Sequence, residues 1–216
     1  MEVSNKAIMR HLKTGNAASD ERTYMLIEEI VCTFREAISP KNVYAMYNCM
    51  VNSQTVTLGG MTISSSSLAG HLKGCCNAVL LAATLGAKTD MVIRRYSIQD
   101  MGKTLIAQSV CTAMLEAYLD EVENDLLQIP ELKGLYPVTR YSPGYGDFDI
   151  TCQNDILPLL DASRIGISLT DGYMMLPLKS VTAIIGFTRN PQQAAKKCTY
   201  NCASCADTNC RLREVV

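Results

Sequence analysis

The chain has 216 residues, 48% of them hydrophobic, and a formal net charge of −1 with a pI near 6.1. A chain of this length can bury one good core, and this hydrophobic content excludes global disorder. The near-neutral charge offers no electrostatic footprint for nucleic acid, and no apolar run reaches the length of a membrane span. Residues 1–6 lack the charged-then-apolar order of a signal peptide, so we expect a cytoplasmic protein.

The N-terminal half predicts a helix, a hairpin and a buried strand. Ser19 or Asp20 is expected to cap a helix that Pro40 ends, because apolar residues recur after the cap at helical spacing. The Gly59–Gly60 pair between two β-prone runs predicts a hairpin. Ser64–Ser67 is expected to cap a short helix. Cys75–Leu85 is almost continuously apolar, which predicts a central strand buried on both faces, with its cysteines as packing thiols.

Helical patterns continue in the middle of the chain, and strands return after it. Gly102 is expected to separate two helices, of which the second covers residues 103–127 and is acidic in its second half. Asn154 is expected to cap a short helix, with Pro158 tolerable only near its first turn. Further strands are expected over residues 165–169, 173–176 and 180–187.

These elements together predict the fold class and the domain organisation. Helices that alternate with turn-linked strands are typical of an α+β domain, here a mostly antiparallel mixed sheet with flanking helices. We expect this domain over residues 1–190 and a separate Cys-rich segment over residues 191–216.

The stretch with the densest chemistry is residues 140–147, Arg-Tyr-Ser-Pro-Gly-Tyr-Gly-Asp. Pro143 and Gly144 suit the two central positions of a type II turn, because proline fixes φ and glycine tolerates the positive φ that follows. Arg140 offers a planar fork of donors that suits a carboxylate or a phosphate. A plain surface turn is the alternative to a loop that binds a ligand.

A second motif follows about thirty residues later, Met175-Leu176-Pro177-Leu178-Lys179-Ser180-Val181. An Arg-x-x-Pro-Gly-Tyr loop followed by Met-x-Pro-x-x-Ser-Val resembles the activation domain of cobalamin-dependent methionine synthase, over roughly residues 139–187. That family binds S-adenosylmethionine and remethylates a cobalamin that has been oxidised. The resemblance implies an activation-domain fold, a role in methionine biosynthesis and, as the enzyme class left open here, a component of a cobalamin-dependent methyltransferase.

The resemblance also implies roles for individual residues. Arg140 would pair with the ligand's carboxylate, while the backbone of Ser142, Pro143 and Gly144 would lie against the ligand. Tyr145 would stack on the ligand or, equally, pack beneath the turn. Two acidic residues complete this set: Asp147 would accept from a ribose hydroxyl, and Glu116 would reach the amino group. No catalytic side chain is implied, because the protein only positions a methyl donor.

Departures from the family pattern bear on the partners. The family loop continues Gly-Tyr-Pro where this chain has Gly144-Tyr145-Gly146-Asp147, and Ile184-Ile185-Gly186 stands where a tyrosine is usual. The Asp-x-His-x-x-Gly pattern of cobalamin-binding domains is absent from the sequence. We therefore expect the chain to act on the cobalamin of a separate corrinoid protein, such as a methionine synthase without its own activation domain. A flavodoxin or a ferredoxin is the candidate electron donor.

Four of the ten cysteines form a Cys-x3-Cys-x2-Cys-x4-Cys run, Cys198, Cys202, Cys205 and Cys210. A single tight run is closer to iron–sulfur spacing than to paired zinc knuckles, so we rank an iron–sulfur cluster first, zinc second and a metal-free redox tail third. Two further functions stay open beside cobalamin reactivation. The chain is alternatively a non-catalytic partner of a corrinoid protein, or an iron–sulfur electron carrier with a vestigial ligand loop.

Overall fold

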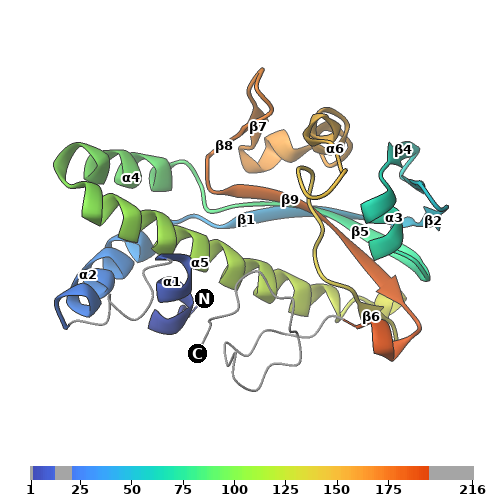
Figure 1. Ribbon diagram of the computed structural model, residues 1–216, viewed down its shortest axis with the longest axis horizontal. Helices are drawn as coiled ribbons and strands as arrows, with labels where there is room; N and C mark the ends of the chain where they lie inside the picture. The colour runs from blue at the N-terminus through green and yellow to red at the C-terminus, as the bar shows by residue number, and fades with distance from the viewer. Residues whose placement is uncertain (1, 13–20, 195–216) are drawn as a thin grey trace. The chain divides into compact units, whose positions relative to one another are not determined.

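The structure is a computed structural model that describes residues 2–12 and 21–194 (Figure 1). The chain divides into two compact units. Unit 1 includes Met1–Ile38 and Lys88–Asp120, and unit 2 includes Ser39–Ala87 and Glu121–Ala195. The expected division into residues 1–190 and 191–216 stays a prediction, since residues 195–216 lie outside the described part.

Unit 1 is helical. It contains α1 (Asn5–Leu12), α2 (Glu21–Ala37), α4 (Lys88–Gln99) and the larger part of α5 (Met101–Leu126), which continues into unit 2. Helix α2 buries one apolar stripe and contacts α4. The stripe consists of Ile27, Ile30, Val31 and Phe34. The helix that was expected to end before Pro40 is therefore confirmed, whereas its expected cap at Ser19 or Asp20 lies outside the described residues.

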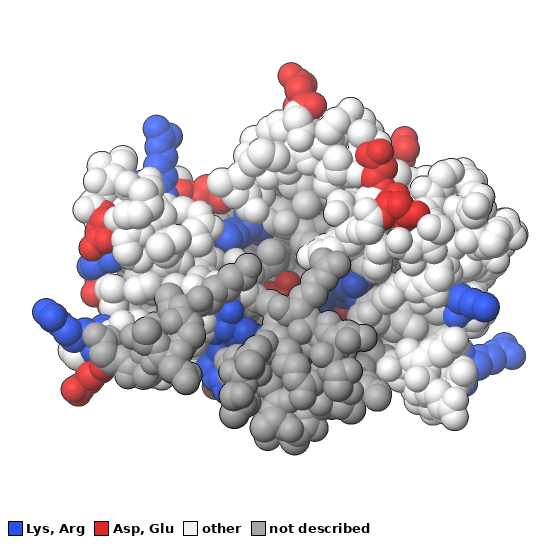
Figure 2. Space-filling view, viewed as in Figure 1, with Lys and Arg blue, Asp and Glu red and all other residues white. Residues whose placement is uncertain are grey.

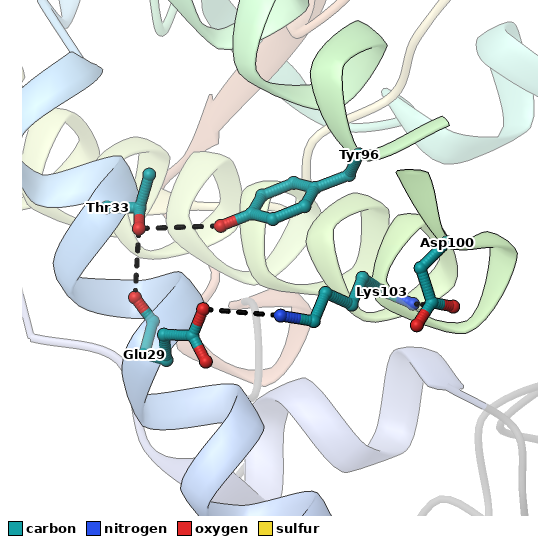
Figure 3. A network of polar contacts seen from close by, with 5 residues as sticks. All are labelled: Glu29, Thr33, Tyr96, Asp100 and Lys103. Atoms are coloured by element: carbon teal, nitrogen blue, oxygen red, sulfur yellow. Dashed lines mark hydrogen bonds and ion pairs between the residues drawn. The ribbon is translucent and has the colours of Figure 1, made fainter. Parts of the chain in front are cut away.

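A polar network on unit 1 links α2, α4 and α5 (Figure 3). The Tyr96 hydroxyl donates to Thr33 Oγ1 over 3.4 Å, and Lys103 Nζ pairs with Glu29 Oε1 at 3.4 Å. The Asp100 carboxylate accepts from the backbone N–H groups of Gly102 and Lys103 at 2.7 and 3.2 Å. The break between α4 and α5 thus falls at Asp100 and not at Gly102 as expected, because the aspartate caps the first turn of α5.

Unit 2 is built on a four-stranded sheet in the order β1-β5-β9-β6. Its strands are β1 (Lys41–Asn48), β5 (Cys75–Thr84), β6 (Tyr136–Pro137) and β9 (Ser180–Thr188). Strand β5 pairs with β1 on one side and with β9 on the other, and Ala78 to Ala83 are fully buried. The expected central strand is confirmed. Every strand pairing among the described residues is antiparallel, so the α+β class with antiparallel sheets is confirmed as well.

The two cysteines that begin β5 differ. Cys75 is buried, and burial raises the pKa of its thiol to about 11, as suits a packing thiol. Cys76 is exposed, so the packing role expected for it is wrong. Adjacent residues of a strand point to opposite faces, and the pairing with β9 also shifts register between Cys75 and Asn77.

A smaller sheet of unit 2 precedes β5. It consists of β2 (Met50–Val51), β3 (Thr55–Leu58) and β4 (Met61–Ser64), and the β3–β4 turn contains Gly59 and Gly60 at φ of 57° and 81°. The expected hairpin is confirmed. Helix α3 (Ser66–His71) follows, and Ser65 caps it by accepting from the Leu68 N–H at 3.0 Å.

In the C-terminal part of unit 2, the helix α6 (Gln153–Leu159) and the two-stranded sheet of β7 (Ser168–Leu169) and β8 (Met175–Leu176) lie over one face of the large sheet (Figure 1). This part of the chain also contains the short 3₁₀ helices η2 (Pro130–Leu132), η3 (Ile150–Cys152), η4 (Ala162–Ile165) and η5 (Pro191–Gln193). Ile156 and Leu157 of α6 share one core with Leu80 of β5 and Ile184 of β9. Tyr141 packs against the same core, which therefore joins α6, β5 and β9 to the segment that contains Tyr141.

Two details of this part differ from expectation. Helix α6 continues directly from η3, which Asp149 caps by accepting from the Thr151 N–H at 2.8 Å, so Asn154 lies inside the helix and is not its cap. Pro158 lies near the end of α6 and not in its first turn. The strands β7 and β8 are shorter than the expected runs, since each pairs over two residues only.

The surface charges and the helices of the described residues agree with the predictions from composition. On the described part of the face in Figure 2, Lys and Arg side chains are interspersed with Asp and Glu. In the described part of the chain, no helix combines the length and the apolar character that crossing a membrane requires.

Candidate functional site

The turn at the centre of the loop has the expected form. The Tyr145 N–H donates to the Ser142 carbonyl at 3.3 Å, and Gly144 has a φ of 94°. A positive φ at the third residue of such a turn is the mark of type II, so the predicted turn is confirmed. Pro143 is buried, whereas Gly144 is exposed and Tyr145 is 58% exposed. The turn therefore presents glycine backbone and a tyrosine ring to solvent.

The second motif leads into β9, and the loop of the first motif pairs with that strand. Tyr141 forms an antiparallel bridge with Ile184 of β9, with N–H to carbonyl distances of 3.0 and 2.8 Å. The Val138 N–H donates to the Gly186 carbonyl at 2.8 Å. Ser180, the serine of the second motif, donates to the Pro177 carbonyl at 2.6 Å. The first motif is thus paired with the strand that follows the second motif in the sequence.

Arg140 forms an ion pair inside unit 2. Its Nη1 lies 3.0 Å from Oε1 of Glu123, and both side chains are 20% exposed. Glu123 belongs to the last turns of α5. A partly buried guanidinium and a partly buried carboxylate therefore lie together, next in sequence to the type II turn.

Sequence reasoning named Glu116 and missed Glu123. Glu123 lies about two helical turns further along α5 than Glu116. Residues seven positions apart lie on the same face of a helix. The acidic cluster therefore indicated the correct face of α5 but not which glutamate on it pairs with Arg140. The role of Glu116 stays a prediction.

The Asp147 carboxylate is bound to the start of α3. Its Oδ1 accepts from the Ser65 hydroxyl at 2.5 Å and from the Ser67 N–H at 3.0 Å. Its Oδ2 accepts from the N–H and the hydroxyl of Ser66 at 2.8 and 2.6 Å. Hydrogen bonds from Ser65 and then Ser66 hold the pKa of this carboxyl well below its usual range. The ribose role of Asp147 stays a prediction, and such a hydroxyl would have to share oxygens that each already accept two bonds.

His71, at the other end of α3, also contacts the loop. Its Nε2 lies 2.7 Å from the Thr139 carbonyl, which can only accept, so Nε2 carries the proton. The His71 ring lies 4.8 Å from the ring of Tyr141, centroid to centroid. Neither contact was visible in the sequence, because 68 residues separate His71 from Thr139.

The predicted cysteine site and one cavity complete the candidates. Cys198, Cys202, Cys205 and Cys210 fall outside the described residues. Within residues 2–12 and 21–194, no three His, Cys, Asp or Glu side chains are placed to hold a metal ion. A cavity of about 520 Å³ lies among α6, η4 and β7, and its lining is largely apolar and includes none of the predicted ligand residues. The loop, and not this cavity, remains the candidate site.

Comparison with known proteins identifies the relatives of this chain. Among solved structures, it is similar to the crystal structure of the MetH reactivation domain bound to AdoHcy, with 13% sequence identity and a TM-score of 0.58. The match covers 76% of this chain and 65% of that one, and at this identity it shows the fold. No curated protein matches the chain. The model of the family described as vitamin B12 dependent methionine synthase, activation domain, matches residues 76–199. Because this match covers more than half of the sequence, the chain belongs to the activation domain family of vitamin B12-dependent methionine synthase.

Proposed function

We propose that this chain binds S-adenosylmethionine at the loop over residues 140–147 and supports the reductive methylation of cobalamin on a separate corrinoid protein. Family membership supports the reaction class, and a protein of the same fold was solved with S-adenosylhomocysteine, the product of methyl transfer. The observation that carries the proposal is the Arg140–Glu123 pair beside the turn.

This pair suits the amino acid end of S-adenosylmethionine, which carries one carboxylate and one ammonium group. A guanidinium binds a carboxylate through charge-assisted, often bidentate hydrogen bonds, and a glutamate accepts from an ammonium group. At 20% exposure both charges are partly shielded from water, which strengthens their interaction with a zwitterion. We assign the ligand's carboxylate to Arg140 and its amino group to Glu123.

The turn completes the arrangement. Gly144 carries no side chain and is exposed, so a ligand can approach the backbone closely there. The exposed ring of Tyr145 offers a face for stacking. No acid, base or nucleophile from this chain is needed for a transfer that depends on position.

In this reaction the inactive cobalamin of the partner gains one electron and one methyl cation. An electron donor reduces the inactive cobalamin, the carbon–sulfur bond of S-adenosylmethionine breaks, and a methyl–cobalt bond forms with release of S-adenosylhomocysteine. A flavodoxin or ferredoxin is the proposed electron donor.

We propose an iron–sulfur cluster at Cys198, Cys202, Cys205 and Cys210 from their spacing alone. Iron and sulfide analysis of anaerobic protein tests it, and stoichiometric zinc without iron would reject it.

The decisive assay uses labelled methyl groups. A corrinoid protein with oxidised cobalamin is incubated under reducing conditions with S-adenosylmethionine labelled in the methyl carbon, with and without this chain. We expect label on cobalamin only when the chain is present, and a large reduction with the Arg140→Ala variant. A chain that binds the corrinoid protein but transfers no label would be a non-catalytic partner.

A further inference from the structure

We propose that helix α3 is a positioning element for the ligand loop, holding it at both ends through Asp147 and through Thr139. This inference rests on the function proposed above, because it states what fixes Arg140 and the turn in place. The four contacting residues of α3 and its cap are Ser65, Ser66, Ser67 and His71.

At the far end of the loop, Asp147 caps α3 from outside the helix. Its two oxygens accept four hydrogen bonds, from two hydroxyls and two backbone N–H groups. The first turn of a helix always has N–H groups without an intrahelical partner, so this carboxylate satisfies donors that need an acceptor. The contact joins residues 80 to 82 positions apart in the sequence.

At the near end, His71 acts on the two neighbours of Arg140. It donates to the carbonyl of Thr139, immediately before the arginine, and its ring contacts the ring of Tyr141, immediately after it. Tyr141 is also bridged to Ile184 of β9. The backbone on both sides of Arg140 is therefore fixed, which leaves only side-chain rotation to place the guanidinium.

Between these ends, Gly146 allows the loop to lie against α3. A Cβ at Gly146 would lie 2.8 Å from Ser67 Oγ and 2.7 Å from the Tyr141 hydroxyl oxygen. Gly146 has a φ of 57°, which proline cannot adopt because its ring fixes φ near −65°. A proline at this position would therefore not permit the backbone that brings the loop against Ser67.

The consequence for ligand binding is preorganisation. A loop that is ordered before the ligand arrives does not spend binding free energy on its own ordering. Small shifts of Arg140 or of the turn would weaken contacts that depend on direction, even where the fold is intact. Removal of either attachment should therefore affect affinity more than it affects unfolding.

The test compares Asp147→Ala and His71→Ala with a matched control, Asp149→Ala. Asp149 lies in the same loop region and is also exposed, but it accepts from Thr151 within its own turn. By calorimetry with S-adenosylmethionine we expect Kd to rise about tenfold for the first two variants and by less than about twofold for Asp149→Ala. His71→Gln, whose amide N–H can replace the Nε2 donor, should recover part of the loss.

Hydrogen exchange separates this inference from the function itself. The Gly144 N–H donates to the Phe148 carbonyl at 2.7 Å, and its protection reports loop order without any ligand. We expect faster exchange of this amide in Asp147→Ala and His71→Ala but not in Asp149→Ala. If Asp147→Ala fails to fold, Ser66→Ala, which removes one donor hydroxyl, takes its place. Unchanged exchange and unchanged affinity in these variants would overturn the proposal. If the variants speed up exchange of the Gly144 amide as expected but the wild type binds no ligand, only the proposed function would be overturned.

Discussion

Asp100 and Asp147 each cap the first turn of an α-helix, and they do so over very different sequence distances. Asp100 in unit 1 accepts from the N–H groups of Gly102 and Lys103, two and three residues away. Asp147 in unit 2 accepts from Ser65, Ser66 and Ser67, about 80 residues away. The chemistry is the same in both, a carboxylate on unpaired helix donors.

The difference lies in what each contact fixes. The Asp100 contact stabilises the junction of α4 and α5, and it joins residues that are neighbours in the sequence. The Asp147 contact joins a loop to an element of a different segment, so its loss frees the loop as well as the helix end. We therefore expect changes at Asp100 to alter stability alone and changes around Asp147 to alter ligand binding.

The largest effect is expected at the residue that this long-range contact positions. Arg140→Ala should weaken binding of S-adenosylmethionine by roughly 2–4 kcal/mol, the usual scale for loss of a desolvated charge-assisted pair. Arg140→Lys should recover only part of it, because an ammonium group lacks the planar fork. Arg164→Ala is the control, since Arg164 is 73% exposed and pairs with Asp161 at 3.8 Å. Equal affinity of the wild type and a folded Arg140→Ala variant would remove Arg140 from the site.

Gly146 tests whether the loop must lie against α3. Gly146→Ala adds a Cβ within 3 Å of Ser67 and Tyr141 at a positive φ, and should cost roughly 1–2 kcal/mol in the free energy of unfolding as well as ligand affinity. Gly60→Ala is the matched control: its φ is also positive, but nothing lies within 4 Å of the added Cβ. It should lose stability and keep affinity. Chemical denaturation and calorimetry measure the two quantities, and parallel behaviour of both variants would contradict the close approach.

The local cap should show the opposite pattern. Asp100→Ala removes the acceptor for two N–H groups of α5 and should lower the free energy of unfolding by about 1 kcal/mol. Affinity for S-adenosylmethionine should not change. A clear loss of affinity in this variant would show that the two caps are not functionally different.

A pH titration probes Asp147 through its lowered pKa. A carboxyl whose folded pKa lies below its unfolded value of about 3.9 adds stability that is present above that pH. This stability is lost as the pH falls below about 4 toward the folded pKa. Melting temperatures of the wild type and Asp147→Asn should therefore differ most at neutral pH and converge in acid. A constant difference across this range would mean that the charge of Asp147 contributes nothing.

The smallest effect is expected at the Lys103–Glu29 pair of unit 1, where the side chains are 31% and 59% exposed. Glu29→Gln should change the free energy of unfolding by less than about 0.5 kcal/mol, because water screens such pairs. Salt dependence of the melting temperature checks this, and a shift of several degrees would assign the network in Figure 3 a larger role.

Local patterns in the sequence predicted the local features of the fold. The hairpin at Gly59–Gly60, the central strand from Cys75 and the turn at Pro143-Gly144 each follow from neighbouring residues, and the structure confirms them. The capping of η3 by Asp149 was missed because two short helices join end to end there.

The contacts that matter for the site are the long-range ones, and they were not predictable. The serine run indicated a cap, and Ser65 is one, but nothing in the sequence relates it to Asp147. Likewise, the acidic half of α5 indicated a helix face and not that Glu123 pairs with Arg140. Such pairings depend on how β9 and α3 place the loop in three dimensions, which residue type and spacing do not encode.

The most direct test of the proposed function is a calorimetric titration of the whole wild-type chain with S-adenosylmethionine at neutral pH. Binding at the Arg140 loop predicts saturable heat at one site per chain, with competition by S-adenosylhomocysteine. Absence of saturable binding to folded protein would contradict it, because a chain without the methyl donor cannot remethylate cobalamin.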